Sequence, residues 1–224
     1  MLWILTSLFF CWLIGRELKR AWFGDAGYER THRTPVHWPY VLVLAALALA
    51  CAWPPLQIWR FERMLSAKAT ELADLRRANV HCNTVFDTFF DSAYLAAGHA
   101  DPDTGEIVFQ YPWCQTLMDY LDHPDHANAT EIASLNLFTH ESMHVRGERN
   151  EAITECQAVQ RNYRAARLLG IADIHARKSA LAYYHGSYLD KGRIGGMQAA
   201  YFSAECAPGR YMDEHLVDST WVLP

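Results

Sequence analysis

Residues 135–160 of the chain read LNLFTHESMHVRGERNEAITECQAVQ and contain an HExxH pattern between His140 and His144. Residues four apart lie on one face of an α-helix, so these two imidazoles can bind a single metal ion. Glu141 lies one step round the same helix, where it can accept a proton from a metal-bound water. A catalytic zinc takes three protein ligands and keeps one position open, and Glu151 is the candidate third ligand.

Capping signals place the pattern on two helices that a glycine turn connects. Asn128, followed by Glu131, has the form of a helix N-terminus, and Gly147 is typical of a helix end. Asn150 can cap a second helix, which Gly170 ends. The first helix is expected to turn its histidines toward a cleft and to bury the opposite stripe, which consists of Ile132, Leu135, Phe138, Ser142 and Val145.

HESMH followed by NEAITE resembles the signature of the thermolysin-type gluzincin metallopeptidases, in which an HExxH helix precedes a helix with NExxxD. The resemblance implies one Zn²⁺ ion held by His140, His144 and Glu151. It also implies that Glu141 is the general base and that Glu155 hydrogen-bonds a zinc-bound histidine. Glu155 replaces the aspartate of the family, and the connection between His144 and Glu151 is shorter than in thermolysin. The region is also similar to uncharacterised actinobacterial membrane proteins, which indicates no substrate.

These roles predict a membrane-anchored zinc metallopeptidase that hydrolyses peptide bonds in a peptide or protein substrate. Glu141 would accept the proton of a zinc-bound water, and the resulting hydroxide would attack the polarised carbonyl. The developing oxyanion needs a hydrogen-bond donor. The candidate donors in the sequence are Tyr163, His185, Tyr211 and His215.

Other functions compete with hydrolysis. HExxH can occur by chance on an amphipathic helix, and the chain would then be a non-catalytic, membrane-anchored envelope or interaction protein with a structural or vestigial metal site. An intramembrane protease is disfavoured because the HExxH segment lies about eighty residues beyond the last apolar stretch and is too polar to enter a bilayer. Histidine and carboxylate ligands also suit divalent ions other than zinc.

The N-terminal region predicts a membrane anchor. Residues 1–15 are apolar throughout, and residues 38–59 form a second apolar stretch with tryptophans near both ends. The connecting loop, residues 16–37, carries five Lys or Arg residues, which favours a cytoplasmic location for it. We therefore expect two transmembrane helices in the cell membrane, with both termini and the catalytic domain extracytoplasmic. Pro54 and Pro55 are expected to kink or end the second helix.

The rest of the chain predicts a mainly α (α+β) domain. Residues 60–81 read as a stalk helix, and residues 82–224 as a small zincin-like domain. Ala93–Ala100 and Ile107–Tyr111 are strand candidates, and the turn DPDTG between them predicts a β-hairpin. An edge strand such as the second could bind an extended peptide by β-addition. A further helix is expected from Ile171 to His185, ending at Gly186.

Cysteine usage indicates an oxidising compartment. Cys82, Cys114, Cys156 and Cys206 are well separated and form no CxxC pair, so they are compatible with two disulfides in any of three pairings. Buried thiols in a cytosolic protein are the alternative.

Composition bounds the remaining possibilities. Apolar residues make up 51% of the 224 residues, which supports a core and excludes general disorder. A net charge of −5 without a basic stripe argues against nucleic acid as a partner. Eleven histidines are compatible with a metal site. The substrate and the oligomeric state stay open.

Overall fold

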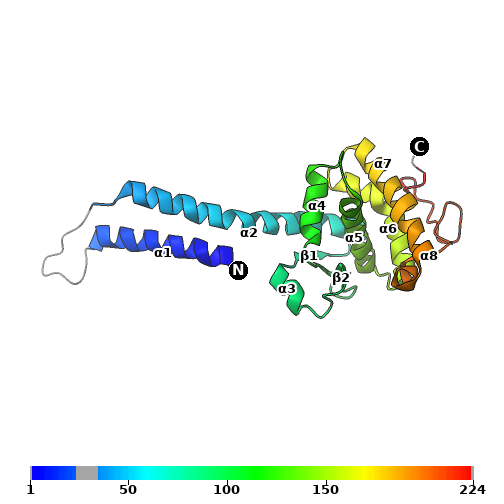
Figure 1. Cartoon of the computed structure of the whole chain (residues 1–224), viewed down its shortest axis with the longest axis horizontal. Helices are drawn as coiled ribbons and strands as arrows, with labels where there is room; N and C mark the ends of the chain where they lie inside the picture. Colours follow the sequence, from blue (N-terminus) through cyan, green and yellow to red (C-terminus); the bar gives the residue numbers. More distant parts are fainter. Residues whose placement is uncertain (1, 24–34, 223–224) are drawn as a thin grey trace. The chain divides into compact units, whose positions relative to one another are not determined.

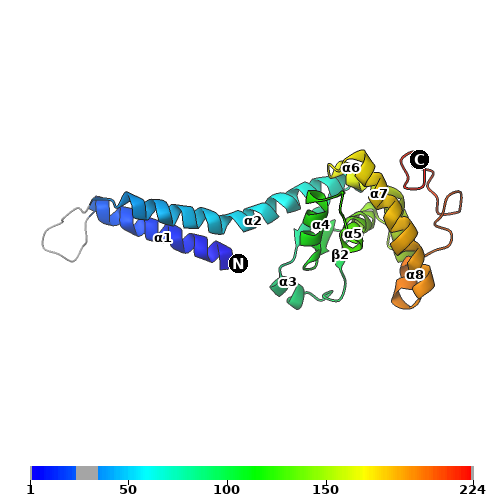
Figure 2. The ribbon, with the colours of Figure 1, turned by 45° about the horizontal axis from the view of Figure 1, so that its top comes forward.

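The computed structural model describes residues 2–23 and 35–222. It divides into two units, residues 1–61 and 62–224, and the boundary lies inside one long helix. Figures 1 and 2 give two views of the ribbon.

The N-terminal unit consists of α1 (Leu2–Phe23) and most of α2 (Trp38–Leu72). Among the described residues, α2 is the one helix that is long and apolar enough to cross a membrane. The first predicted span, residues 1–15, continues as a helix to Phe23. The basic residues up to Arg20, which are predicted to lie in the connecting loop, therefore lie on α1. Residues 24–34 of the predicted basic loop lie outside the described residues. Pro54 and Pro55 are inside α2, so the expected helix end there is wrong.

The second unit is mostly helical and includes a small sheet. After α2 come β1 (Asn79–Cys82), α3 (Val85–Phe90), β2 (Gly98–Ala100), β3 (Glu106–Phe109), α4 (Trp113–Asp122), α5 (Ala129–Arg146), α6 (Glu151–Leu168), α7 (Asp173–Ala182), the π-helix η1 (Tyr183–Tyr188), α8 (Leu189–Ile194) and the 3₁₀-helix η2 (Gly196–Tyr201). The mainly α fold class is confirmed.

The sheet has the order β1-β3-β2. β2 and β3 are antiparallel and joined by the turn that starts at Asp101, so the predicted hairpin is confirmed with shorter strands. β1 pairs with β3 in parallel. β3 is therefore the central strand, and the prediction that Ile107–Tyr111 offers a free edge is wrong. The edge strands are β1 and β2.

The chain reverses after α2, and β1 runs back along the helix. Polar side chains of α2 accept hydrogen bonds from the returning backbone, so β1 is fixed against the last turns of the helix. The contacts are Ala78 N to Thr70 Oγ1 (2.9 Å), Val80 N to Ser66 Oγ (2.8 Å) and Cys82 N to Glu62 Oε1 (2.8 Å). The predicted stalk helix 60–81 is thus wrong in its bounds: its first part ends α2 at Leu72, and its last part begins β1 at Asn79.

α5 is the central helix of the second unit. It contacts α4, α6 and strands β2 and β3 (Figures 1 and 2), so nearly every residue from Ser134 to Val145 is buried. The expected stripe is buried at Leu135, Phe138, Ser142 and Val145, and His140 on the other side lines a cleft, but burial of α5 extends well beyond one stripe. Several of the buried side chains are polar, and buried polar groups must find partners. Thr139 and Ser142 bond to backbone carbonyls one turn back, whereas His140, Glu141 and His144 need other partners.

The helical segment after α6 is longer than expected. Gly186 does not end it, because α7 continues through η1 into α8 without a break. Tyr183, Tyr184 and Tyr188 of η1 join a buried cluster with Val159 of α6. Two disulfides are confirmed, and the pairs are Cys82–Cys114 and Cys156–Cys206.

Ion pairs attach the C-terminal segment to α6. Glu214 accepts from the buried Arg161 guanidinium (2.5 Å), and Asp218 accepts from Arg164 (2.5 and 2.7 Å). Burial raises the pKa of Glu214, but the Arg161 and Arg146 guanidinium groups together lower it more. The Arg164 hydrogen bond lowers the pKa of Asp218.

These lowered pKa values predict acid sensitivity. Both folded-state pKa values lie below the unfolded ones, so the stabilisation is complete above about pH 4.5 and is lost as pH falls through the folded values. We expect Glu214→Gln to lower the free energy of unfolding by about 2 kcal/mol at pH 7, because the variant leaves Arg161 without its carboxylate. Urea unfolding measured at a series of pH values should show that the free energies of unfolding of wild type and variant become equal in acid. A difference in the free energy of unfolding between wild type and variant that stays the same at every pH would contradict this account.

Candidate metal centre

Local sequence signals place the histidines and Glu151 on facing helix ends. Asn128 caps α5, accepting from the backbone N–H groups of Thr130 and Glu131, while Glu131 bonds back in a capping box. At the other end, Gly147 takes φ 121°, a conformation that favours glycine, and its N–H donates to the His144 carbonyl (2.9 Å). α5 therefore ends at Arg146, two residues after His144.

The connection to α6 is held by its own polar groups. The Glu148 side chain accepts from the backbone N–H groups of Arg149 (2.9 Å) and Asn150 (2.8 Å). Asn150 in turn accepts from Ile153 N (3.1 Å) and caps α6. The first residue of α6 is Glu151, so the turn returns its carboxylate toward the two histidines.

The three predicted ligand atoms form a triangle. His140 Nε2 lies 3.1 Å from His144 Nε2 and 3.1 Å from Glu151 Oε2, and the third side, His144 Nε2 to Glu151 Oε2, is 3.5 Å. Ligands at zinc–nitrogen distances in a tetrahedron are separated by about 3.3 Å. The described part of the chain thus contains a His₂Glu group whose spacing fits one divalent ion.

Hydrogen bonds on the far side of each ring determine where the ring protons lie. His144 Nδ1 is 2.8 Å from the Glu148 carbonyl oxygen, which can only accept, so Nδ1 carries the proton. His140 Nδ1 is 2.8 Å from Glu155 Oε2 and donates to that carboxylate. In the neutral rings both Nε2 atoms then direct lone pairs at each other and at the Glu151 carboxylate. Such an arrangement requires a positive charge at its centre.

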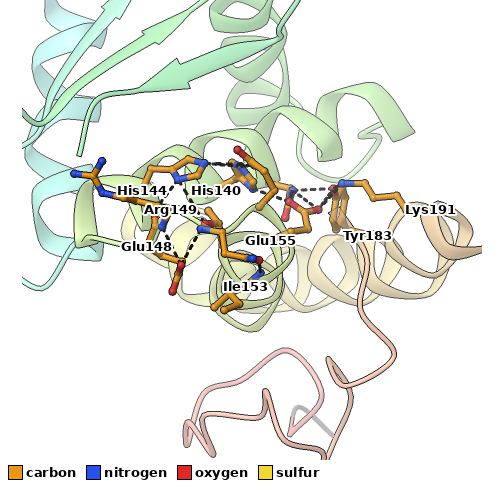
Figure 3. A network of polar contacts seen from close by, with 12 residues as sticks. His140, His144, Glu148, Arg149, Ile153, Glu155, Tyr183 and Lys191 are labelled. Carbon is orange, nitrogen blue, oxygen red and sulfur yellow. Dashed lines mark hydrogen bonds and ion pairs between the residues drawn. The ribbon is translucent and has the colours of Figure 1, made fainter. Parts of the chain in front are cut away.

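Glu155 is a buried anion with several donors (Figure 3). Its Oε1 accepts from Lys191 Nζ (2.5 Å), Tyr183 OH (2.7 Å) and Asn136 Nδ2 (3.1 Å). Its Oε2 faces His140, and the residue is 1% exposed. Because both oxygens are engaged, Glu155 orients the His140 ring rather than offering an oxygen to a metal.

The pKa shifts agree with this charge pattern. Burial lowers the pKa of His140, but the hydrogen bonds with Glu151 and Glu155 raise it more, to about 10. Burial raises the pKa of Glu155, whereas His140 and Lys191 lower it to about 2. The hydrogen bonds from His140 and then His144 hold the pKa of Glu151 far below its usual range. The Nε2 end of the site therefore favours a cation, either a proton or a metal ion.

Glu141 lies beside the triangle but has a different environment. It is 3% exposed, and its Oε2 has no hydrogen-bond partner among the described residues. Burial raises the pKa of its carboxyl group. Its other oxygen lies close to Gly98 of β2, where a Cβ atom would stand 3.5 Å from Oε1. A buried carboxyl without a protein partner can accept a proton from a molecule in the adjacent cleft.

A cleft of about 710 Å³ reaches His140 and Glu141. One wall comes from residues 95–98, which lead into β2, together with Trp113. The opposite wall comes from α8 and η2 and includes Lys191 and Tyr201. The Tyr201 ring centroid is 5.7 Å from that of His140, and the Lys191 ammonium lies 5.3 Å above the Tyr201 ring. The site can therefore be reached by a ligand larger than water.

The donors expected to stabilise an oxyanion are not among the residues that line this cleft. The Tyr163 hydroxyl donates to Asp173, Tyr211 is 92% exposed, and His215 pairs with Asp213. His185 lies on the exposed side of η1. The residues missed from the sequence that do reach the site are Asn136, Tyr183, Lys191 and Tyr201.

A substitution at Glu155 tests its role in orienting His140. We expect Glu155→Gln to weaken zinc affinity about 10–100-fold, because an amide neither stabilises the Nδ1–H of His140 nor compensates Lys191 as a carboxylate does. Competition with a fluorescent chelator measures the change. Glu71→Gln, on the exposed face of α2, is the matched control and should bind zinc like wild type. Unchanged affinity in Glu155→Gln would show that the His140–Glu155 bond does not support metal binding.

The structure brings together the four residues predicted to form the metal site: His140, His144, Glu151 and Glu155. Glu141 lies beside them at the cleft. Comparisons of the chain with protein-family models, with curated proteins and with solved structures find no match.

Proposed function

We propose that the chain is a membrane-anchored zinc metallopeptidase, with His140, His144 and Glu151 as the ligands of one Zn²⁺ ion. The observation that supports this most directly is the convergence of three ligand atoms within 3.1–3.5 Å, one of them from His140, which lines a cleft. A His₂Glu set is a known donor set for catalytic zinc, and it leaves one coordination position open. Glu141, buried and next to the site, completes the constellation that the resemblance to gluzincins implies.

A zinc ion held there would act as a Lewis acid that lowers the pKa of water and polarises a carbonyl oxygen. The chain's own residues supply the rest. Glu141 accepts a proton at its free Oε2 and can pass it to the leaving amine. Glu155 keeps the His140 ring in one tautomer and one orientation. Lys191 neutralises Glu155, so this buried carboxylate does not repel a second carboxylate or a substrate anion.

Substrate binding is best supported on the β2 side of the cleft. β2 is an edge strand, and Gly98, its first residue, lies beside both the cleft and Glu141. An extended peptide could add to this edge by main-chain hydrogen bonds. Tyr201 also lines the cleft, with its ring centroid 5.7 Å from that of His140, and is our candidate donor for a developing oxyanion.

The proposed location is the outer side of the cell membrane. α2 provides the anchor, and α1 would be a second, shorter span. Both disulfides lie in the second unit, so that unit is expected in an oxidising compartment.

The decisive experiment is a search for cleavage. Full-length protein in detergent micelles, loaded with one equivalent of zinc, is incubated with a complex peptide mixture, and new termini are identified by mass spectrometry. Termini that appear with wild type and not with Glu141→Gln support the proposal. If wild type binds zinc stoichiometrically but yields no Glu141-dependent termini, the alternative of a non-catalytic interaction protein with a structural metal site is favoured instead.

A further inference from the structure

The short helix α3 exposes an unusual set of apolar side chains. Phe86, Phe89 and Phe90 are 76%, 75% and 80% exposed, and Val85 beside them is 57% exposed. Positions three and four apart share a helix face, so the phenylalanines form one surface, called here the α3 patch (Val85, Phe86, Phe89, Phe90). A cluster of exposed aromatic side chains on a folded domain marks a site of interaction with a membrane or with another protein.

The helix is held to the domain by its polar residues, which is the reverse of the usual arrangement. Thr88 Oγ1 accepts from Tyr111 N (2.8 Å). Asp91, at the end of α3, accepts from Asn83 Nδ2 (3.1 Å) and Gln110 Nε2 (2.8 Å). The polar side therefore faces the protein and the aromatic side faces outward. These bonds hold the patch in place without any contribution from its own apolar side chains.

The position of α3 along the chain indicates what covers the patch. Glu62 follows Trp59, the last residue of the apolar stretch, by three residues, or about 4.5 Å along the helix axis. β1 runs back along α2 and ends with Cys82 N bonded to Glu62 Oε1 at 2.8 Å. Val85 follows Cys82 by three residues, which span at most about 10 Å of chain. α3 therefore follows a strand that is bonded to Glu62, three residues after the apolar stretch of α2 ends.

We propose that the α3 patch inserts into the headgroup region of the lipid bilayer that α2 crosses. The inference rests on α2 as a membrane span and does not depend on hydrolysis. Aromatic side chains are favoured at this level of a bilayer, where one side of a helix is apolar and the other is wet. Exposed Arg60, which directly follows the apolar stretch, could interact with anionic headgroups at the membrane surface.

Membrane docking would also place the cleft near the bilayer. The chain leaves α3 through the exposed Tyr94 and Leu95 and then forms the cleft wall up to Gly98. If the proposed peptidase activity holds, polypeptide segments close to the membrane are the favoured substrates. This consequence rests on the proposed function, whereas the docking itself is tested without it.

The test uses the full chain in nanodiscs of phosphatidylcholine and phosphatidylglycerol. An environment-sensitive NBD fluorophore is attached at Phe89→Cys, in a background where the free cysteines Cys11 and Cys51 are alanine. The matched control carries the same label at Ile174→Cys on α7, a position that is 71% exposed. Mass spectrometry verifies that both disulfides are intact, and zinc content and thermal unfolding verify the fold.

We expect the label at position 89 to emit at shorter wavelength than the label at 174. Lipids that carry a nitroxide near the top of the acyl chain should quench the first label and leave the second unchanged. Adding Phe86→Ser and Phe90→Ser to the labelled protein should reduce this quenching, although the fold is preserved. Quenching of the label at 89 by aqueous iodide, and not by nitroxide lipid, would overturn the proposal. Protection from both quenchers would also overturn it, since the patch would then be covered by protein such as a second copy.

Discussion

Glu141→Gln is expected to reduce kcat by about 10²–10⁴-fold while the zinc content stays at that of wild type. Glutamine has the shape of glutamate, but its amide cannot take up the proton that hydrolysis releases. The affected oxygen, Oε2, is buried and has no hydrogen-bond partner among the described residues. Kinetics on a peptide found by the cleavage search, with metal analysis of the same samples, measure the effect.

The same substitution should not lower stability. Burial disfavours the charged form of Glu141 and so raises the pKa of its carboxyl group. A neutral amide avoids that desolvation cost, so we expect the unfolding temperature of Glu141→Gln to equal or exceed that of wild type. A stable, zinc-loaded and inactive variant would identify Glu141 as the general base. Full activity in Glu141→Gln would exclude that role, and loss of zinc would assign the residue to metal binding instead.

Removal of the metal is expected to produce the largest loss of stability. An ion present at 1,000 times its Kd contributes about 4 kcal/mol, and in a domain of this size each kcal/mol shifts Tm by about 2–4 °C. Chelation with EDTA should therefore lower the unfolding temperature by about 10 °C. Part of the loss is offset because His140, with its raised pKa, can take up a proton in place of the ion.

His144→Ala supplies the control for this experiment. It removes one corner of the triangle and the bond to the Glu148 carbonyl, so its Tm should respond neither to EDTA nor to added zinc. Calorimetry of both proteins, before and after chelation and after zinc is restored, makes the comparison. If the Tm of wild type changes neither with EDTA nor with added zinc, the protein has no metal centre at this position, whatever the cleavage assay shows.

The metal triangle could be predicted from the sequence because its signals are local. His140 and His144 are four residues apart on one helix, and Gly147 and Asn150 mark the turn that brings Glu151 back. Each of these residues acts within one or two turns of chain, where spacing alone determines which groups can meet.

Lys191 and Tyr201 could not be predicted in the same way. They reach the site because α7 continues through Gly186 as a π-helix, and no capping residue signals that continuation. The buried state of α5 was also missed. Its apolar residues suggest one packed stripe, whereas α4, α6 and the sheet cover it on several sides. The parallel pairing of β1 with β3, and the choice of disulfide partners, depend on tertiary contacts between segments distant in sequence.

The bridge between Cys156 and Cys206 has a bearing on how the protein matures. Cys156 adjoins Glu155 on α6, and Cys206 follows Tyr201 by five residues, so the bond attaches the segment next to the cleft residue Tyr201 to the helix that carries Glu151 and Glu155. A nascent chain held among reducing thiols could load its ion on α5 and α6 while this segment stayed unattached. Thiol oxidation during export would then be the step that converts a metal-loaded precursor into a protein with a finished binding cleft.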